Sequence, residues 1–198
     1  MADSRFNIRV QEVLSANVQI VRDQLENVEG LGPALQEAAE LVGESLLQGN
    51  KLLLCGNGGS ACDAAHFAEE ISSRYQLERP GYPAIDLTAE HAAVMALVND
   101  YPAEQVFARR VQAMGGPGDV LVVFSTSGRS TNVRLALEVA PSKRMKTIAM
   151  LGGDGGDCRG LADVELVVAS DTTARVQEAH LLLYHTICEV LDPVLAEG

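Results

Sequence analysis

Apolar residues recur at helical spacing over positions 7–49. Those at 13–25 precede a Gly-Leu-Gly-Pro sequence at 30–33, and those at 35–47 follow it with a period of three to four residues. Because glycine and proline disfavour helix, the pattern predicts two helices with a break at 30–33. Gly49 is typical of the residue that ends a helix.

From position 51 onward, short continuous apolar runs alternate with helical stretches. Runs that are apolar on both faces and separated by helices are typical of a parallel sheet covered on both sides. We therefore predict an α/β fold, a three-layer α/β/α sandwich preceded by N-terminal helices, in one domain spanning 1–198. The predicted strands are 51–55, 83–87, 120–124, 146–151 and 164–168, and a long helix follows over 174–194.

Composition and charge exclude several classes of function. The 198 residues suffice for one domain with a sizeable core, and the net charge of −12 argues against binding to nucleic acid or anionic membranes. No apolar run is long enough to span a bilayer, and the N-terminus lacks a signal peptide's apolar stretch, so we expect a cytoplasmic protein. The four cysteines lack CxxC spacing, which disfavours thiolate zinc sites and a disulfide framework.

Two short loops, at 55–60 and 125–130, each lie where a predicted strand turns into a predicted helix. Ligands of parallel α/β sheets bind beyond the carboxyl ends of the strands, so we expect both loops to share one crevice. In the first loop, Gly56, Gly58 and Gly59 let backbone N–H groups approach a ligand closely. Its spacing matches neither G-x-G-x-x-G nor the Walker loop, which leaves a phosphate cradle or a plain tight turn.

The second loop carries four hydroxyl side chains at the predicted start of a helix. Hydroxyls, backbone N–H groups and a helix N-terminus together make an uncharged anion site, although Ser and Thr also favour turns and caps. Arg129 either adds charge to this site or points to solvent. In the first loop, Ser60 and Asp63 have the spacing of a capping box. The four hydroxyl residues are Ser125, Thr126, Ser127 and Ser130.

Two helices carry candidate chemistry beside the loops. His66 and Glu70 are four residues apart, so they lie on one helix face, where they could ligate a metal, act as acid and base, or hydrogen-bond to each other. The last helix carries Gln177, His180 and His185 among apolar residues. An amphipathic core helix has no need of His185, which is either functional or a hydrogen-bonded core histidine.

Together these segments resemble the sugar isomerase (SIS) domain family, and within it the phosphoheptose isomerases. The resemblance covers nearly the whole chain and implies a five-stranded parallel sheet flanked by helices. It also implies a homotetramer with active sites at subunit interfaces, in which 1–50 serve in oligomerisation and 51–198 bind the sugar phosphate. The motifs that carry it are 55–60, 66–70, Arg79-Pro80, Asn99-Asp100, 125–130, 154–156 and 175–178.

The resemblance further implies roles for individual residues. Glu70 and His185 match the catalytic base and acid. The ligands of one Zn²⁺ per subunit match His66, Glu70, Gln177 and His185. The substrate-binding positions match Asn57, Gly58, Gly59, Ser60, Glu70, Arg74, Asn99, Asp100, Ser125, Thr126, Ser127, Ser130 and Gln177.

The implied reaction interconverts sedoheptulose 7-phosphate and D-glycero-D-manno-heptose 7-phosphate, the first step toward activated heptose for surface polysaccharide such as lipopolysaccharide. Ketose–aldose isomerisation needs a base that moves a proton between C1 and C2, and an acid or Lewis acid that stabilises the enediolate. A carboxylate, an imidazole and a zinc ion supply these functions. Gln177 and His185 lie about 12 Å apart on a continuous helix. Their convergence on one ion requires side chains that lean toward each other, a bent helix, or residues from different subunits. Together with the interface sites that the resemblance implies, this leads us to expect at least one site residue from a neighbouring chain.

Two other interpretations stay open. Some proteins with this domain are non-catalytic, such as a replication-initiator-associating relative, and others convert or sense a different phosphosugar. The presence of Glu70 and His185 favours an enzyme over a binding protein. The full set, with His66 and Gln177, favours the heptose branch.

Overall fold

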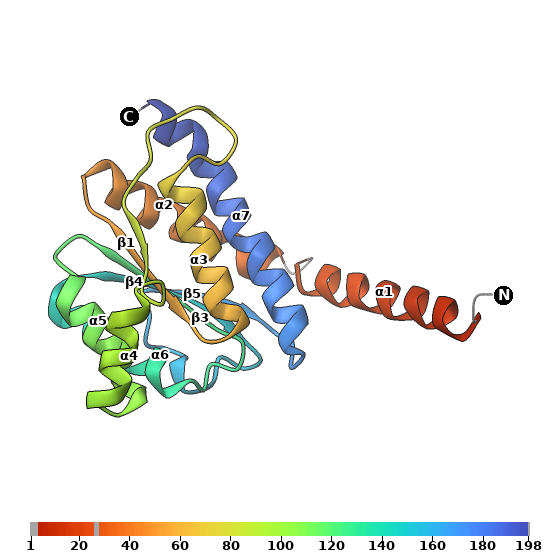
Figure 1. Cartoon of the computed structure of the whole chain (residues 1–198). Coiled ribbons are helices and arrows are strands. Elements are labelled where there is room, and N and C mark those ends of the chain that lie inside the picture. The colour runs from red at the N-terminus through yellow and green to blue at the C-terminus, as the bar shows by residue number, and fades with distance from the viewer. Residues whose placement is uncertain (1–3, 26–27, 198) are drawn as a thin grey trace.

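Five parallel strands form one sheet in the order β2-β1-β3-β4-β5 (Figure 1). The computed structural model describes residues 4–25 and 28–197, and its strands confirm the five predicted ones to within two residues at each end. The strands are β1 (Leu52–Gly56), β2 (Ala84–Asp86), β3 (Val120–Ser125), β4 (Lys146–Gly152) and β5 (Val164–Val168). The helices are α1 (Ser4–Leu25), α2 (Val28–Leu47), α3 (Gly59–Ser72), α4 (His91–Asp100), α5 (Val106–Met114), α6 (Thr131–Val139) and α7 (Thr173–Glu197). Single 3₁₀ turns are η1 (Ala103–Gln105), η2 (Ala140–Lys143) and η3 (Gly156–Cys158).

Both faces of the sheet are buried, because successive strand side chains point in opposite directions. In β1, Leu52 and Leu54 join the core formed with α2, α3 and α7. Leu53 and Cys55 join the core formed with α5 and α6 on the other face. Figure 1 shows these two groups of helices on opposite sides of the sheet, which confirms the predicted three-layer sandwich. Among the described residues, no helix combines the length and apolar character that crossing a membrane would require.

The N-terminal helices differ from the prediction at their junction. α1 ends at Leu25 and α2 begins at Val28, so the break predicted at 30–33 is wrong and this sequence lies inside α2. Pro33 lies near the start of α2, where few backbone hydrogen bonds are lost. The burial of positions 35–47 against α7 outweighs the low helix propensity of the glycines. Gly49 has a φ of +80° and follows the end of α2, as predicted.

The sheet topology places the two predicted loops together. β2 lies on one side of β1, whereas β3, β4 and β5 lie on the other. β1 continues into α3 on one face of the sheet, and β3 continues into α6 on the opposite face. The chain therefore diverges at the carboxyl ends of β1 and β3, which is where open α/β sheets form their ligand crevice.

A buried ion pair joins the end of α7 to the segment that follows α3. The Asp192 carboxylate accepts a hydrogen bond from Arg79 Nε at 2.8 Å, and both side chains are almost fully buried. It also accepts the backbone N–H groups of Gln76 and Leu77, at 2.9 and 2.6 Å. Burial alone would raise the pKa of Asp192, but these hydrogen bonds outweigh it and the pKa is lowered. Arg79 donates in turn to the Glu70 carbonyl at 2.8 Å, so the pair holds the backbone of Glu70.

We expect Asp192→Asn to lower the free energy of unfolding by about 3–5 kcal/mol, because it leaves the Arg79 charge buried without a partner. Urea denaturation measures this loss. Lys146→Met is the matched control, since Lys146 pairs with Asp163 on the surface, and it should cost less than about 1 kcal/mol. Equal losses for the two variants would contradict the structural role of the buried pair.

Candidate active site

The loop after β1 enters α3 earlier than predicted. α3 begins at Gly59, preceded by Gly58 with a φ of +55°, a conformation that favours glycine. Ser60 is therefore buried inside the first turn, and no side chain caps the helix. The predicted capping box of Ser60 and Asp63 is wrong, because α3 begins at Gly59 and Gly58, not Ser60, holds the N-cap position. Asp63 Oδ2 is buried without a hydrogen-bond partner, and burial raises the pKa of Asp63 to about 6.

The two predicted loops contact each other at the carboxyl ends of β1 and β3, and the crevice expected between them stays a prediction. The side-chain amides of Asn57, in the first loop, and Asn132, just after the second, exchange two hydrogen bonds of 2.9 and 2.8 Å. Within the second loop, the Ser125 and Ser130 hydroxyl oxygens lie 3.3 Å apart. Ser130 precedes α6 without capping it through its side chain. Hydroxyl and amide groups therefore gather at the point where the strands diverge.

The loop after β4 packs tightly against the second loop. A Cβ atom on Gly128, whose φ is +63°, would lie 1.9 Å from the Gly155 carbonyl oxygen. A Cβ atom on Gly152 would lie 2.2 Å from the Thr126 carbonyl oxygen. The Cys158 N–H also donates to the Gly128 carbonyl at 2.9 Å. These two loops thus touch backbone to backbone and form one unit.

A pocket of about 240 Å³ opens between these two loops and the start of α7. At this pocket the Arg129 guanidinium pairs with the Asp154 carboxylate at 3.0 Å, so Arg129 is held by a neighbouring loop. The Gly156 N–H and then Arg129 lower the pKa of Asp154. Asp171 and Thr173 also line this pocket, and their sequence gives no signal of it, because they reach the pocket only through the path of the chain after β5. The lining residues are Thr126, Ser127, Arg129, Gly153, Asp154, Asp171 and Thr173.

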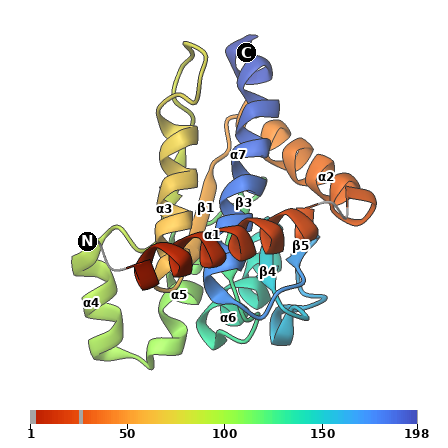
Figure 2. The same ribbon diagram turned by 90° about the vertical axis from the view of Figure 1, so that its right-hand side faces the viewer.

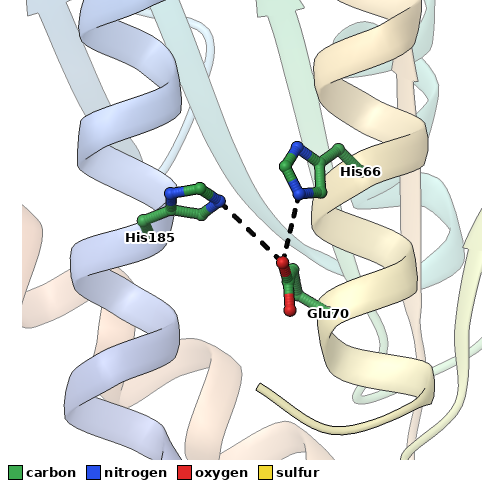
Figure 3. Close-up of side chains that lie close together, drawn as sticks. All are labelled: His66, Glu70 and His185. Carbon is green, nitrogen blue, oxygen red and sulfur yellow. Dashed lines mark hydrogen bonds and ion pairs between the residues drawn. The ribbon is translucent and has the colours of Figure 1, made fainter. Parts of the chain in front are cut away.

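His66, Glu70 and His185 converge in one chain (Figure 3). We call these three residues the trio. His66 and Glu70 lie one turn apart on α3, with His66 Nε2 at 3.1 Å from Glu70 Oε1. His185 projects from α7, and its Nε2 lies 4.0 Å from the same oxygen. One nitrogen or oxygen atom of each residue lies within 4.8 Å of the others. These three residues thus come together within one chain. For the other predicted site residues, a site shared between neighbouring chains stays a prediction.

The trio fits a divalent cation. His185 Nε2 is buried without a hydrogen-bond partner, although it points at a carboxylate. Burial and the neighbouring His66 lower the pKa of His185, with Glu70 opposing them, which favours a neutral imidazole. Two imidazoles and one carboxylate form a donor set that zinc takes in catalytic sites, where a further position stays open for substrate.

Gln177 lies against the start of α3 and links the trio to the loops. A Cβ atom on Gly59 would lie 2.3 Å from Gln177 Nε2, so the amide occupies the space that glycine leaves. Gln177 and His185 are on the same side of the fold, two turns apart on α7. α7 therefore carries one predicted site residue beside the crevice and another in the trio.

Two predicted substrate-binding residues lie outside the trio and the loops. Asn99 and Asp100 are exposed at the end of α4, where Asn99 Nδ2 donates to Asp100 Oδ1 at 2.8 Å. Arg74 is exposed after α3, lies 3.9 Å from the Glu78 carboxylate and precedes Tyr75, whose ring centroid is 5.9 Å from that of His185. In the described part of the chain, the hydrogen bonds and ion pairs of these three side chains join residues close in sequence. The predicted role of Asn99 and Asp100 would require a second chain.

His180 is a core histidine. It is fully buried, and its Nε2 lies 3.1 Å from the Leu151 carbonyl oxygen, to which it donates, at the carboxyl end of β4. Burial lowers the pKa of His180 to about 4. Of the two histidines of α7, only His185 therefore joins the trio.

Comparison with known proteins identifies the family of the chain. A family model described as the SIS domain matches residues 18–152. The phosphoheptose isomerase of Aliarcobacter butzleri is 48% identical over 169 residues, covering 85% of this chain and 89% of the relative. That of Shewanella sp. (strain ANA-3) is 42% identical over 189 residues, covering 94% and 96%. The solved phosphoheptose isomerase of Neisseria gonorrhoeae superposes with a TM-score of 0.86 at 38% identity, covering 95% of this chain and 99% of that one.

The chain therefore belongs to the SIS domain family, and within it to the phosphoheptose isomerases. It is an enzyme, an isomerase. More distant neighbours, such as the Vibrio vulnificus NanR protein at 18% identity and a TM-score of 0.65, share the fold alone.

We expect acid to destabilise the protein through His180. An unfolded histidine has a pKa of about 6.5, whereas that of His180 is about 4, so the unfolded chain takes up the proton first. The contribution of neutral His180 to the free energy of unfolding is fully present above pH 6.5 and is lost as the pH falls toward 4. At pH 5 the loss is about 2 kcal/mol. His180→Gln keeps an N–H for the Leu151 carbonyl but does not titrate. Between pH 7 and 5 its free energy of unfolding, measured by urea denaturation, should therefore fall by correspondingly less than that of wild type. Identical pH dependence of the two proteins would contradict this assignment.

Proposed function

We propose that the protein interconverts sedoheptulose 7-phosphate and D-glycero-D-manno-heptose 7-phosphate. The observation that carries this proposal is the approach of His185 to Glu70, on two helices that both start beside a hydroxyl-lined crevice. A carboxylate and an imidazole are the groups that an enediol proton transfer needs. The choice of a heptose phosphate as the substrate rests on the names of the relatives, which are phosphoheptose isomerases.

The phosphate end of the sugar would bind at the crevice. The Ser125, Thr126, Ser127 and Ser130 side chains, with the start of α6, offer uncharged donors to a phosphate. From Gly59, at the crevice, to His66 is seven residues of α3, or about 10 Å. An extended seven-carbon sugar phosphate is of similar length, so C1 and C2 would lie at the trio while the phosphate stays at the loops.

Glu70 would act as the base and His185 as the acid. The carboxylate removes a proton from C1 of the ketose and returns it to C2, while the neutral imidazole accepts the proton of O1 and passes it to O2. Both histidine contacts of Glu70 involve Oε1, which leaves Oε2 for the substrate proton. The neutral form of His185 that its environment favours can accept the O1 proton.

His66, Glu70 and His185 would hold one Zn²⁺ per subunit, with Gln177 as a further ligand. Zinc bound there would polarise the carbonyl and hydroxyl oxygens at C1 and C2. Glu70 would serve both as ligand and as base. Since its Oε1 already contacts both histidines, we assign ligation to Oε1 and proton transfer to Oε2.

We propose a homo-oligomer, a homotetramer by resemblance, in which residues 1–50 take part in assembly. α1 extends away from the sheet, as Figures 1 and 2 show, and exposes a stripe of Val10, Val13, Leu14 and Val18. A groove of about 620 Å³ lies between α2 and α7. α4 exposes Met95 and Val98 next to Asn99 and Asp100. Apolar surface of this extent favours subunit contacts, and a contact at α4 would bring Asn99 and Asp100 to a neighbour's crevice.

The activity is tested with sedoheptulose 7-phosphate, following the aldose product by NMR with and without added Zn²⁺. We expect Glu70→Gln to lower kcat by about 10²–10⁴-fold, because the amide cannot take the C1 proton. Glu69→Gln is the matched control on the exposed side of the same turn and should keep wild-type activity. Binding of the sugar phosphate without turnover, zinc present, would sink the enzyme proposal and favour a non-catalytic binding protein.

Mixing inactive variants tests the shared site. Glu70→Gln combined with Asp100→Ala should recover about a quarter of wild-type activity, because half of random pairs are mixed and each holds one intact site. Glu70→Gln combined with His185→Gln should recover none, since both residues come from the same chain. Rescue is measured after subunit exchange has been demonstrated by mass. No rescue in the first mixture would contradict a site completed by α4.

A further inference from the structure

Tyr184 lies between the two histidines of the trio, one residue before His185 on α7. Its side chain is fully buried, and its ring stacks on Phe67 with centroids 5.4 Å apart and planes 18° apart. Phe124 packs edge-on against the same ring at 6.0 Å. Apolar contacts therefore fix the ring, and with it the position of the hydroxyl group.

The Tyr184 hydroxyl contacts His66 on the nitrogen that faces away from Glu70. Tyr184 Oη lies 2.9 Å from His66 Nδ1, and His66 Nε2 lies 3.1 Å from Glu70 Oε1. A neutral imidazole carries one N–H, and an ionised carboxylate only accepts. Nε2–H therefore donates to Glu70, and the Tyr184 hydroxyl donates to Nδ1.

A cation on His66 Nε2 would require the opposite tautomer. The proton of His66 would then be on Nδ1 and would need an acceptor, which is how outer partners orient metal-bound histidines. A hydroxyl can serve both tautomers, because it donates and accepts. A carboxylate or a backbone carbonyl, the common partners of such histidines, would only accept and would disfavour the Nε2–H form.

A reversed bond would leave the hydroxyl proton of Tyr184 in need of an acceptor, and Asp63 Oδ2, on the same helix as His66, is a buried acceptor without a partner. Asp63 precedes His66 by three residues on α3. It interacts electrostatically with both His66 and Tyr184. A buried acceptor without a partner carries a desolvation cost, which a hydrogen bond from Tyr184 would remove.

We propose that Tyr184 is a positioning residue that holds His66 in either tautomer. Its hydroxyl group donates to Nδ1 when Nε2–H faces Glu70. When a divalent cation takes Nε2, the hydroxyl group accepts from Nδ1–H and donates its own proton to Asp63 in a hydrogen bond. No covalent bond is made or broken beyond the exchange of one proton between the nitrogens of His66. The inference rests on the proposed zinc site.

The test compares Tyr184→Phe with Tyr82→Phe as purified full-length proteins. Tyr184→Phe keeps the packed ring and removes only the hydroxyl group. Tyr82→Phe is the matched control, because its hydroxyl donates to the Leu195 carbonyl at 3.0 Å, away from the trio. Zn²⁺ affinity is measured by competition with a chromophoric chelator, and thermal unfolding of the metal-free proteins controls for folding.

We expect Tyr184→Phe to weaken Zn²⁺ binding by about 10–100-fold, and Tyr82→Phe to leave it within twofold. A second readout is NMR of ¹³C-labelled histidine, simple because the chain has four histidines. The His66 signal, assigned through His66→Gln, should change from the Nε2–H to the Nδ1–H pattern when wild-type protein binds Zn²⁺. In metal-free Tyr184→Phe the same signal should show less of the Nε2–H pattern than wild type, because the hydroxyl group no longer donates to Nδ1. A merely structural role for Tyr184 would leave that pattern unchanged.

The outcomes separate this inference from the proposed function. Equal Zn²⁺ affinity of Tyr184→Phe and wild type overturns the role of Tyr184 and leaves the zinc site standing. An unchanged His66 tautomer on zinc binding shows that zinc does not take His66 Nε2, and it overturns both the tautomer reversal and His66 as a ligand. Failure of wild type to bind Zn²⁺ overturns the zinc site and the tautomer reversal together. The isomerase assay then decides whether Glu70 and His185 act without a metal.

Discussion

The register between α3 and α7 is the constraint on which the site depends. At one end, the Gln177 amide fills the space beside Gly59. At the other, the buried Asp192 carboxylate holds Arg79 and the segment after α3. Between these two anchors the helices run side by side, and Tyr184 and His185 meet His66 and Glu70. A shift of one residue in either helix would rotate its side chains by about 100° and separate the trio.

The sheet topology supports the proposed phosphate site, although the chain is acidic. The net charge of −12 disfavours anions in general, yet the carboxyl ends of β1 and β3 bring helix starts, amides and hydroxyls to one place. Arg129 is paired with Asp154 and adds little unbalanced charge. Fixed dipoles would therefore do the binding, and they act over short distances.

The amino-acid sequence alone predicts the sheet, both loops and the pair of His66 and Glu70, because each follows from local spacing. His185 is suggested by an imidazole on an apolar helix face. Asn132 and Tyr184 could not be found in this way, since an amide after a loop and a tyrosine in a core helix have many ordinary roles. Two predictions are wrong, the break at 30–33 and the capping box at Ser60. Packing along α2 overrides the local preference of its glycines, whereas α3 begins at Gly59, so that Ser60 lies inside the helix and not at its cap.

The interlocked loops after β3 and β4 have a consequence for how a ligand is received. Gly128, Gly152 and Gly155 allow contacts that leave no room for a side chain between the two backbones. Such loops cannot close over a phosphate by moving independently, so the cradle is formed before the ligand arrives. Little conformational entropy is then lost at the anchored end of the sugar. Any adjustment to sugars of different length must take place at the opposite end, where side chains of α3 and α7 rather than backbone line the site.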